Sequence, residues 1–213
     1  EPVEGHTVEV AANHGRFQLT QHASTVYTDR LFAAMDVVMG PDGTPVCRSD
    51  IDPTTGYEID YFTASSAWRG SGVYYSNEYF TFTPGDGQCQ PLNPFGLNAA
   101  SPEAQDFVTA RTREELTVEQ TVLSAVAFGE FDVLQNFVAG PIGYAAGVEY
   151  REESSNNVLS DNLLGILPAG SAVAPGELVA DVDPYAVSIL GTDNAQQFNT
   201  GGSYDVYDVY AEV

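Results

Sequence analysis

Residues 139–153 read Ala-Gly-Pro-Ile-Gly-Tyr-Ala-Ala-Gly-Val-Glu-Tyr-Arg-Glu-Glu, and this stretch decides the class of fold. Successive side chains of an extended chain point to opposite faces. One face is apolar and ends in a tyrosine; its members are Ile142, Tyr144, Ala146, Val148 and Tyr150. The other face is small or charged; its members are Gly143, Ala145, Gly147, Glu149 and Arg151. This alternation is typical of a soluble sandwich strand, and equally of a transmembrane barrel strand with an apolar outside and a polar lumen.

Other segments have a similar strand pattern. Residues 204–213 read Tyr-Asp-Val-Tyr-Asp-Val-Tyr-Ala-Glu-Val and are expected to form the last strand. One or two strands are expected within 6–27, and a strand over 119–131 is expected to pair with one over 142–152. The chain is therefore predicted to be all-β with antiparallel strands.

The charge of the chain excludes several kinds of partner. The 213 residues include 7 arginines, no lysine and 30 acidic residues, which gives a formal net charge of −23. Such a surface repels phosphate backbones and anionic lipid headgroups, which disfavours nucleic acid as a partner. Excess carboxylate favours solubility and attracts cations, so we expect an extracellular or salt-adapted surface, with a dedicated cation site as the alternative. The sequence contains no run of about twenty apolar residues, so we expect no transmembrane helix.

The two cysteines indicate an oxidising compartment. Cys47 and Cys89 lie in polar, turn-rich surroundings, and we expect them to form one disulfide, with two free thiols as the alternative. They do not predict a zinc site because no histidine cluster adjoins them. The histidines, His6, His14 and His22, recur every eight residues, which is no recognised metal-ligand spacing.

A long loop separates the first strand from the later ones. Residues 40–100 contain many glycines, prolines and aromatic residues, a composition typical of a functional loop. Short helices are expected on either side of it, over 28–39 behind a cap at Thr28 and Asp29, and over 101–110. Residues 155–200 are polar and only weakly patterned.

Aromatic residues of this loop are the best candidates for binding a ligand. Trp68, Arg69, Tyr74 and Tyr75 are expected to stack on sugar rings or aromatic chelators. The alternative is that they form a small core beside the disulfide.

The acidic residues do not predict catalysis. Neighbours such as Glu152 and Glu153 point to opposite faces of a strand, whereas a glycosidase needs two carboxyl groups across one cleft. We therefore expect no enzyme and no cofactor. The pairs Asp50/Asp52 and Asp181/Asp183 resemble halves of calcium loops without the EF-hand spacing, so an incidental calcium contact is the most they indicate.

The order of several motifs resembles that of a known family. Val46-Cys-Arg-Ser49 is followed by Cys89-Gln-Pro-Leu-Asn-Pro-Phe-Gly96, by residues 100–108, and then by the strand segments 117–124, 139–153 and 204–213. In this order the motifs resemble a long extracellular loop of TonB-dependent outer-membrane receptors and the barrel strands that follow it. The helical segment at 28–36 is similar to the approach to that loop.

The resemblance implies a protein of the bacterial outer membrane, surrounded by lipid, that takes up a siderophore, vitamin or oligosaccharide. It implies contact with TonB through a part of the receptor outside this sequence. Barrels of this family have about twenty-two strands, whereas this chain supplies roughly six to eight and no plug domain. All 213 residues are therefore expected to be part of a barrel, with 28–118 as a long extracellular loop region.

The resemblance also predicts which side chains of the strand at 142–152 face lipid. In the receptor, Val148 and Tyr150 face lipid, whereas Glu149 and Arg151 face the lumen. The alternative function is a secreted, acidic all-β module that binds carbohydrate or belongs to a surface layer held together by cations.

Overall fold

The computed structural model describes residues 5–54, 79–131, 141–183, 188–191 and 197–213. These residues form two compact units. The sheet unit comprises Glu1–Thr20, Glu115–Val158 and Thr200–Val213. The loop unit comprises Gln21–Glu114 and Leu159–Asn199.

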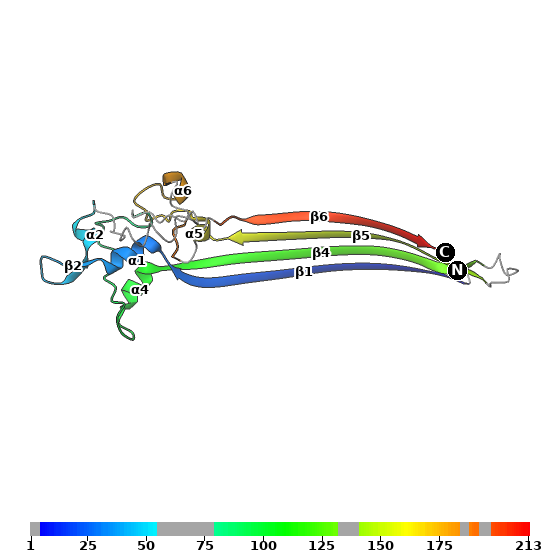
Figure 1. The fold of residues 1–213 in the computed structure, drawn as a ribbon, viewed down its shortest axis with the longest axis horizontal. Coiled ribbons are helices and arrows are strands. Elements are labelled where there is room, and N and C mark those ends of the chain that lie inside the picture. Colours follow the sequence, from blue (N-terminus) through cyan, green and yellow to red (C-terminus); the bar gives the residue numbers. More distant parts are fainter. Residues whose placement is uncertain (1–4, 55–78, 132–140, 184–187, 192–196) are drawn as a thin grey trace, which may run out of the picture. The chain divides into compact units, whose positions relative to one another are not determined.

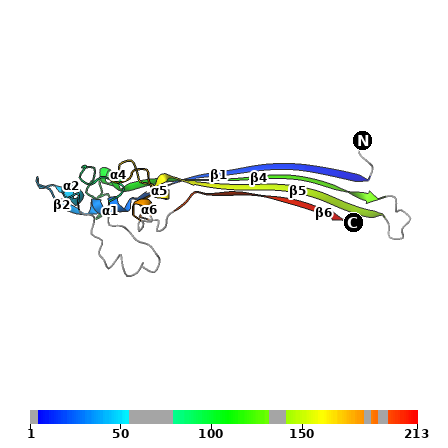
Figure 2. The same cartoon turned by 90° about the horizontal axis from the view of Figure 1, so that it is seen from above.

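Four long strands make up the main sheet. They are β1 (His6–Val26), β4 (Thr109–Phe131), β5 (Ile142–Leu159) and β6 (Thr200–Glu212). Their order is β1-β4-β5-β6, and neighbouring strands lie side by side and run in opposite directions (Figure 1, Figure 2). The predicted class of antiparallel β structure is confirmed. The strands are longer than predicted; β4, for example, begins ten residues before the expected start at 119.

The loop unit holds the shorter elements. A two-stranded ribbon pairs β2 (Val37–Met39) with β3 (Pro45–Cys47). The helices are α1 (Thr28–Met35), α2 (Arg48–Ile51), α4 (Pro102–Val108), α5 (Asp161–Leu164) and α6 (Val179–Val182). Over the described ranges, no helix has the length and apolar character that crossing a membrane requires.

The helix predicted over 28–39 is confirmed for 28–35 and wrong for its last four residues, 36–39. The helix ends at Met35, and Val37 pairs with Cys47 in the ribbon. Two successive valines favour a strand because their branched side chains pack well on a pleated surface. The turn at the tip of the ribbon needs a left-handed residue, which Gly43 supplies with φ of 81°.

The helix α4 begins as predicted and ends earlier than expected. The hydroxyl oxygen of Ser101 accepts a hydrogen bond from the backbone N–H of Ala104 at 3.1 Å, and Pro102 occupies the first helical position. Both features stabilise a helix start. The helix ends at Val108, where the chain passes into β4.

Two apolar clusters form the interior of the loop unit. The first contains Ala33, Ala34, Cys47, Tyr79, Phe82, Cys89, Phe107 and Val108. The second contains Phe80, Ala110, Leu167, Val179, Ile189 and Leu190. Residues 79–82 thus contribute side chains to both clusters. The second cluster draws most of its members from the region that the sequence left weakly patterned.

The predicted disulfide is confirmed. Cys47 and Cys89 are bonded across a sequence separation of 42, and both side chains are buried in the first cluster. The bond joins β3 to the segment that enters α4. The bond reduces the conformational freedom of the unfolded chain and adds few contacts to the folded one. Its contribution to the free energy of unfolding therefore grows with the length of the loop that it closes.

Replacing both cysteines with serine is expected to destabilise the loop unit by about 4 kcal/mol, because the unfolded loop regains its freedom. The measurement is amide hydrogen exchange at the buried residues Ala33 and Ala34 of the full chain, with reductant-treated wild type as the control. If these amides exchange as slowly in the double-serine variant and in the reduced wild type as in the oxidised wild type, the expectation is contradicted.

Candidate functional site

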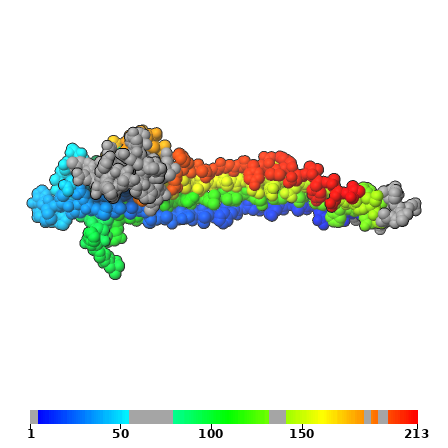
Figure 3. All heavy atoms as spheres, viewed as in Figure 1, coloured from blue at the N-terminus to red at the C-terminus, as the bar shows by residue number. Residues whose placement is uncertain are grey.

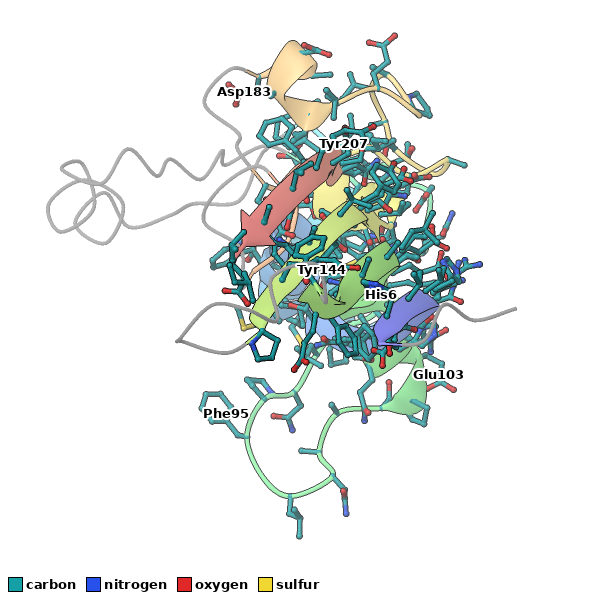
Figure 4. The ribbon with its side chains drawn as sticks, turned by 90° about the vertical axis from the view of Figure 1, so that its right-hand side faces the viewer. His6, Phe95, Glu103, Tyr144, Asp183 and Tyr207 are labelled. Atoms are coloured by element: carbon teal, nitrogen blue, oxygen red, sulfur yellow. A yellow bond between two sulfur atoms is a disulfide. The ribbon has the colours of Figure 1, made fainter. Side chains whose placement is uncertain are left out.

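Side-chain contacts across the main sheet determine which residues share a face. The Nδ1 atom of His6 in β1 lies 2.9 Å from the hydroxyl oxygen of Tyr144 in β5, and Figure 4 labels both residues. The Tyr144 ring stacks on that of Phe131 in β4, with centroids 4.7 Å apart. In the adjoining pair, Val148 lies opposite Val209 of β6. With the period-two alternation of strands, these contacts place one set of residues on a single face, here called the apolar face.

The apolar face carries uncharged side chains along about nine residues of β4 and β5, or roughly 27 Å of strand. Its apolar members are Val8, Val10, Ala12, Leu123, Ala125, Ala127, Phe131, Ile142, Tyr144, Ala146, Val148, Tyr150, Tyr207, Val209 and Ala211. Val10 is 78 % exposed, Val148 51 % and Val209 80 %. The four strands form adjacent bands of surface in the space-filling view (Figure 3). Such a surface is unfavourable in water, at about 25 cal/mol for each Å².

Polar pairs border the apolar face on β1 and β4. His14 Nδ1 lies 3.0 Å from the hydroxyl oxygen of Thr121. One step further along, Arg16 Nε lies 3.4 Å from a carboxylate oxygen of Glu119. Both pairs are on the same face as the valines, so the change from apolar to polar occurs along the strands.

An aromatic pair marks the same border on β5 and β6. The rings of Tyr150 and Tyr207, which lie opposite each other, have centroids 4.9 Å apart. The next residues on this face are Glu152 and Asp205, which also lie opposite each other. The tyrosines therefore separate the apolar part of the face from its charged part.

The opposite face, here called the polar face, contains a hydrogen-bonded group around Glu153. This carboxylate accepts hydrogen bonds from the Gln120 amide at 2.7 Å and from the Tyr204 hydroxyl. Arg151 Nε lies 3.7 Å from a Glu153 oxygen. Phe17 and Phe128 also belong to this face, so its character is mixed.

Gly147 of the polar face lies beneath the ring of Tyr210. A Cβ atom on Gly147 would lie 2.6 Å from that ring, so a larger residue fits there only if the Tyr210 side chain moves. The alternation predicted for 142–151 is confirmed, since Val148 and Tyr150 lie on the apolar face and Arg151 lies on the polar one.

A buried carboxylate organises the loop unit. Asp29 is 4 % exposed and accepts hydrogen bonds from the backbone N–H groups of Phe80 at 2.8 Å and Thr81 at 2.7 Å, and from the Thr81 hydroxyl at 2.7 Å. Arg30 Nε donates to the same hydroxyl oxygen at 3.0 Å, and its guanidinium lies 4.5 Å from the centre of the Tyr27 ring. Burial raises the pKa of Asp29, while the hydrogen bonds from Thr81, Phe80 and Arg30 act in the opposite direction.

This role of Asp29 differs from the one expected at a helix start. The sequence predicted a cap at Thr28 and Asp29. Tyr27 is the N-cap residue and its side chain makes no capping hydrogen bond, whereas the Asp29 carboxylate accepts from the backbone N–H of Arg30 in the first turn at 2.8 Å. The same carboxylate also binds Phe80 and Thr81, about fifty residues away, and no local signal in the sequence identifies that partner.

The predicted ligand-binding residues lie outside the described part of the chain. Trp68, Arg69, Tyr74 and Tyr75 belong to residues 55–78, so their role stays a prediction.

The acidic residues show no assembled centre in the described ranges. Glu152 accepts a hydrogen bond from the Tyr150 hydroxyl at 3.2 Å on one face, while Glu153 binds Gln120 on the other. No group of three or more His, Cys, Asp or Glu side chains within these ranges is placed to hold a metal ion. The incidental calcium contact at Asp50/Asp52 or Asp181/Asp183 stays a prediction.

Comparison of the chain with protein-family models, with curated protein sequences and with solved structures returns no match.

Replacing Asp29 with asparagine is expected to destabilise the loop unit by about 2 kcal/mol, because an amide cannot accept from all the donors that the carboxylate binds. The measurement is hydrogen exchange at the amides of Phe80 and Thr81 in the full chain. Asp161→Asn is the matched control because Asp161 is exposed, and it should leave those amides unchanged. Equal exchange in the two variants would contradict the role of Asp29.

Proposed function

We propose that the chain forms part of the barrel of a bacterial TonB-dependent outer-membrane receptor, which takes up a small-molecule nutrient. The observation that carries this proposal is the exposed apolar face of the main sheet, backed by a polar face. In water this arrangement is unfavourable, whereas in a bilayer the hydrocarbon covers the apolar face. The order of motifs in the sequence supports the choice of this family among membrane barrels.

The size of the apolar face supports the proposal. It extends roughly 27 Å along β4 and β5, and barrel strands tilt by about 40° from the membrane normal. The projected height is then about 21 Å, close to the apolar band of about 25 Å that surrounds such barrels. Tyr150 and Tyr207 lie at one border of the face, where outer-membrane barrels carry an aromatic girdle.

The polar face is assigned to the lumen. Glu149, Arg151 and Glu153 would then face the interior, where water or other polar groups solvate them. In the described sheet, β1 and β6 are the outer strands. Unpaired strand edges are costly in hydrocarbon, and four strands are too few for a barrel that transports nutrients, so we assign both edges to pairing with further barrel strands.

The loop unit is assigned to the extracellular side. Its disulfide fits an oxidising environment, and its acidic character fits an exposed surface. The nutrient is expected to contact the loop region 28–118, where the sequence places Trp68, Arg69, Tyr74 and Tyr75. Contact with TonB is assigned to a part of the receptor outside this sequence.

A secreted carbohydrate-binding or surface-layer module is the second candidate. A soluble sandwich buries its apolar strand faces against a second sheet. Among the described residues no segment buries Val10, Val148 or Val209. We therefore favour the receptor.

The experiment compares two neighbouring substitutions in the complete gene product. Val209→Arg introduces a charge near the middle of the apolar face, and Asp208→Arg introduces the same side chain on the polar face. An arginine facing the midplane of a bilayer destabilises a barrel by about 2–4 kcal/mol. We expect this loss for Val209→Arg and a much smaller change for Asp208→Arg, measured by denaturant unfolding in liposomes.

Equal effects of the two substitutions would contradict the assignment of the faces. Recovery of the wild-type protein as a soluble monomer without detergent would contradict the receptor itself.

A further inference from the structure

A groove with an apolar wall lies within the loop unit. Its volume is about 550 Å³, which is typical of a site for a small organic molecule. The apolar wall includes Tyr27, Ile166, Leu167, Pro168 and Pro175. Sites of this kind combine an apolar surface with a few polar groups that select the ligand, so the polar lining indicates the chemistry of the occupant.

Backbone hydrogen bonds fix the apolar wall of the groove. Ile166 pairs with Leu178 in a β-bridge, and the N–H of Leu167 donates to the Glu177 carbonyl at 2.9 Å. The N–H of Gly176 donates to the Leu167 carbonyl at 2.9 Å. Leu167 is 1 % exposed and belongs to the second apolar cluster, so the wall is part of the folded core. A preformed wall loses little entropy when a ligand binds.

Three polar residues of the lining already have partners within the protein. The Ser160 hydroxyl donates to the side-chain oxygen of Asn162 at 2.6 Å, and the Asn162 amide donates to the Arg111 carbonyl at 2.8 Å. The Arg111 guanidinium pairs with the Asp106 carboxylate at 2.9 Å. Because Asp106 compensates the charge of Arg111, these three residues leave the lining without a net charge.

Asp161 is the fourth polar residue of the lining, and it gives the groove a negative charge. Its side chain is exposed, and within the described ranges its carboxylate makes no hydrogen bond or ion pair. The net charge of −23 also attracts small cations to the surface of the chain. A carboxylate beside an apolar wall is complementary to a ligand that carries a positive charge beside an apolar body.

The Tyr27 ring offers the ligand apolar contact rather than a site for its charge. The Arg30 guanidinium lies 4.5 Å from the centre of this ring and forms a cation–π contact with it. A second cation on the same ring would be repelled by Arg30. The charge of the ligand is therefore expected at Asp161.

We propose that the groove binds a small amphipathic amine. The ammonium group pairs with the carboxylate of Asp161, and the apolar body packs against Ile166 and Pro168. An ion pair at an exposed carboxylate contributes up to about fivefold in affinity, so the expected binding is weak and its preference for the amine is modest. The inference rests on the loop unit alone and does not depend on the receptor proposal.

Neutral and anionic molecules of the same shape are the less favourable occupants. A neutral molecule contacts the wall equally well but leaves the Asp161 carboxylate without a partner. An anion is repelled by Asp161 and by the net charge of the chain. A comparison of ligands that differ only in charge therefore tests the assignment directly.

The experiment uses 2-phenylethylamine, 2-phenylethanol and 3-phenylpropanoate as probes. Each is titrated into the ¹⁵N-labelled full chain in micelles of a zwitterionic detergent, and equilibrium dialysis gives the free concentration of the probe. Dissociation constants are obtained from the amide shifts of Ile166, Leu167 and Gly176. We expect the amine to bind about fivefold more tightly than the alcohol, and the anion to give no saturable shift. The amides of Ala33 and Ala34, in the first cluster, should stay unchanged.

Two pairs of variants separate the groove from its surroundings. Asp161→Asn should remove the preference for the amine over the alcohol, whereas Asp181→Asn removes the same charge from an exposed residue outside the lining and should retain the preference. Ala169→Arg obstructs the groove from an exposed lining position and should weaken the binding of both probes at least tenfold. Ala172→Arg adds the same side chain to an exposed position outside the lining and should leave the binding unchanged.

Several results would overturn the inference. They are equal affinities for the amine and the alcohol, tighter binding of the anion, and the absence of saturable shifts at the groove. A preference for the amine that survives Asp161→Asn, or that Asp181→Asn reduces equally, would show that the net charge of the chain attracts the amine without this site.

Discussion

The alternation of side chains along β5 and β6 is the constraint on which the sheet depends. Because residues two apart share a face, Val148, Tyr150, Tyr207 and Val209 cannot point anywhere except to the side opposite Arg151. One face of the sheet therefore carries an apolar surface that is exposed in the described structure. A surface of this extent needs a cover other than water, and the proposal of a lipid-facing barrel wall follows from that requirement.

The loop unit is stabilised by different means. Its helices are short, and short isolated helices are marginal in water, so tertiary contacts must hold them. The Cys47–Cys89 bond restricts the unfolded loop, and Asp29 holds Phe80 and Thr81 by hydrogen bonds in a buried site. Since the segment around Thr81 contributes to both apolar clusters, this anchor connects them. The unit thus has its own interior, while the sheet unit leaves Val10, Val148 and Val209 of its apolar face exposed.

The features that the sequence predicted are those that depend on neighbouring residues. The strand over 142–152 and its two faces follow from period-two alternation, and the start of α4 follows from Ser101 and Pro102. The pairing of the only two cysteines was predictable because it has a single solution.

The features that the sequence did not predict depend on distant contacts. The residues 37–39 continue a helical spacing, and only pairing with 45–47 makes them a strand. The partners of Asp29 at Phe80 and Thr81 are about fifty residues away, and Leu167, Val179 and Leu190 come together from a segment without a clear period.

Spin labelling along β5 tests the lipid-facing assignment most directly. Nitroxides are attached singly at Val148, Glu149, Tyr150 and Arg151 of the complete gene product in liposomes, and their accessibility to oxygen and to a water-soluble nickel complex is compared. We expect the labels at Val148 and Tyr150 to be accessible mainly to oxygen, and those at Glu149 and Arg151 mainly to nickel. The reverse order, or equal access of nickel to all four labels, would contradict the assignment.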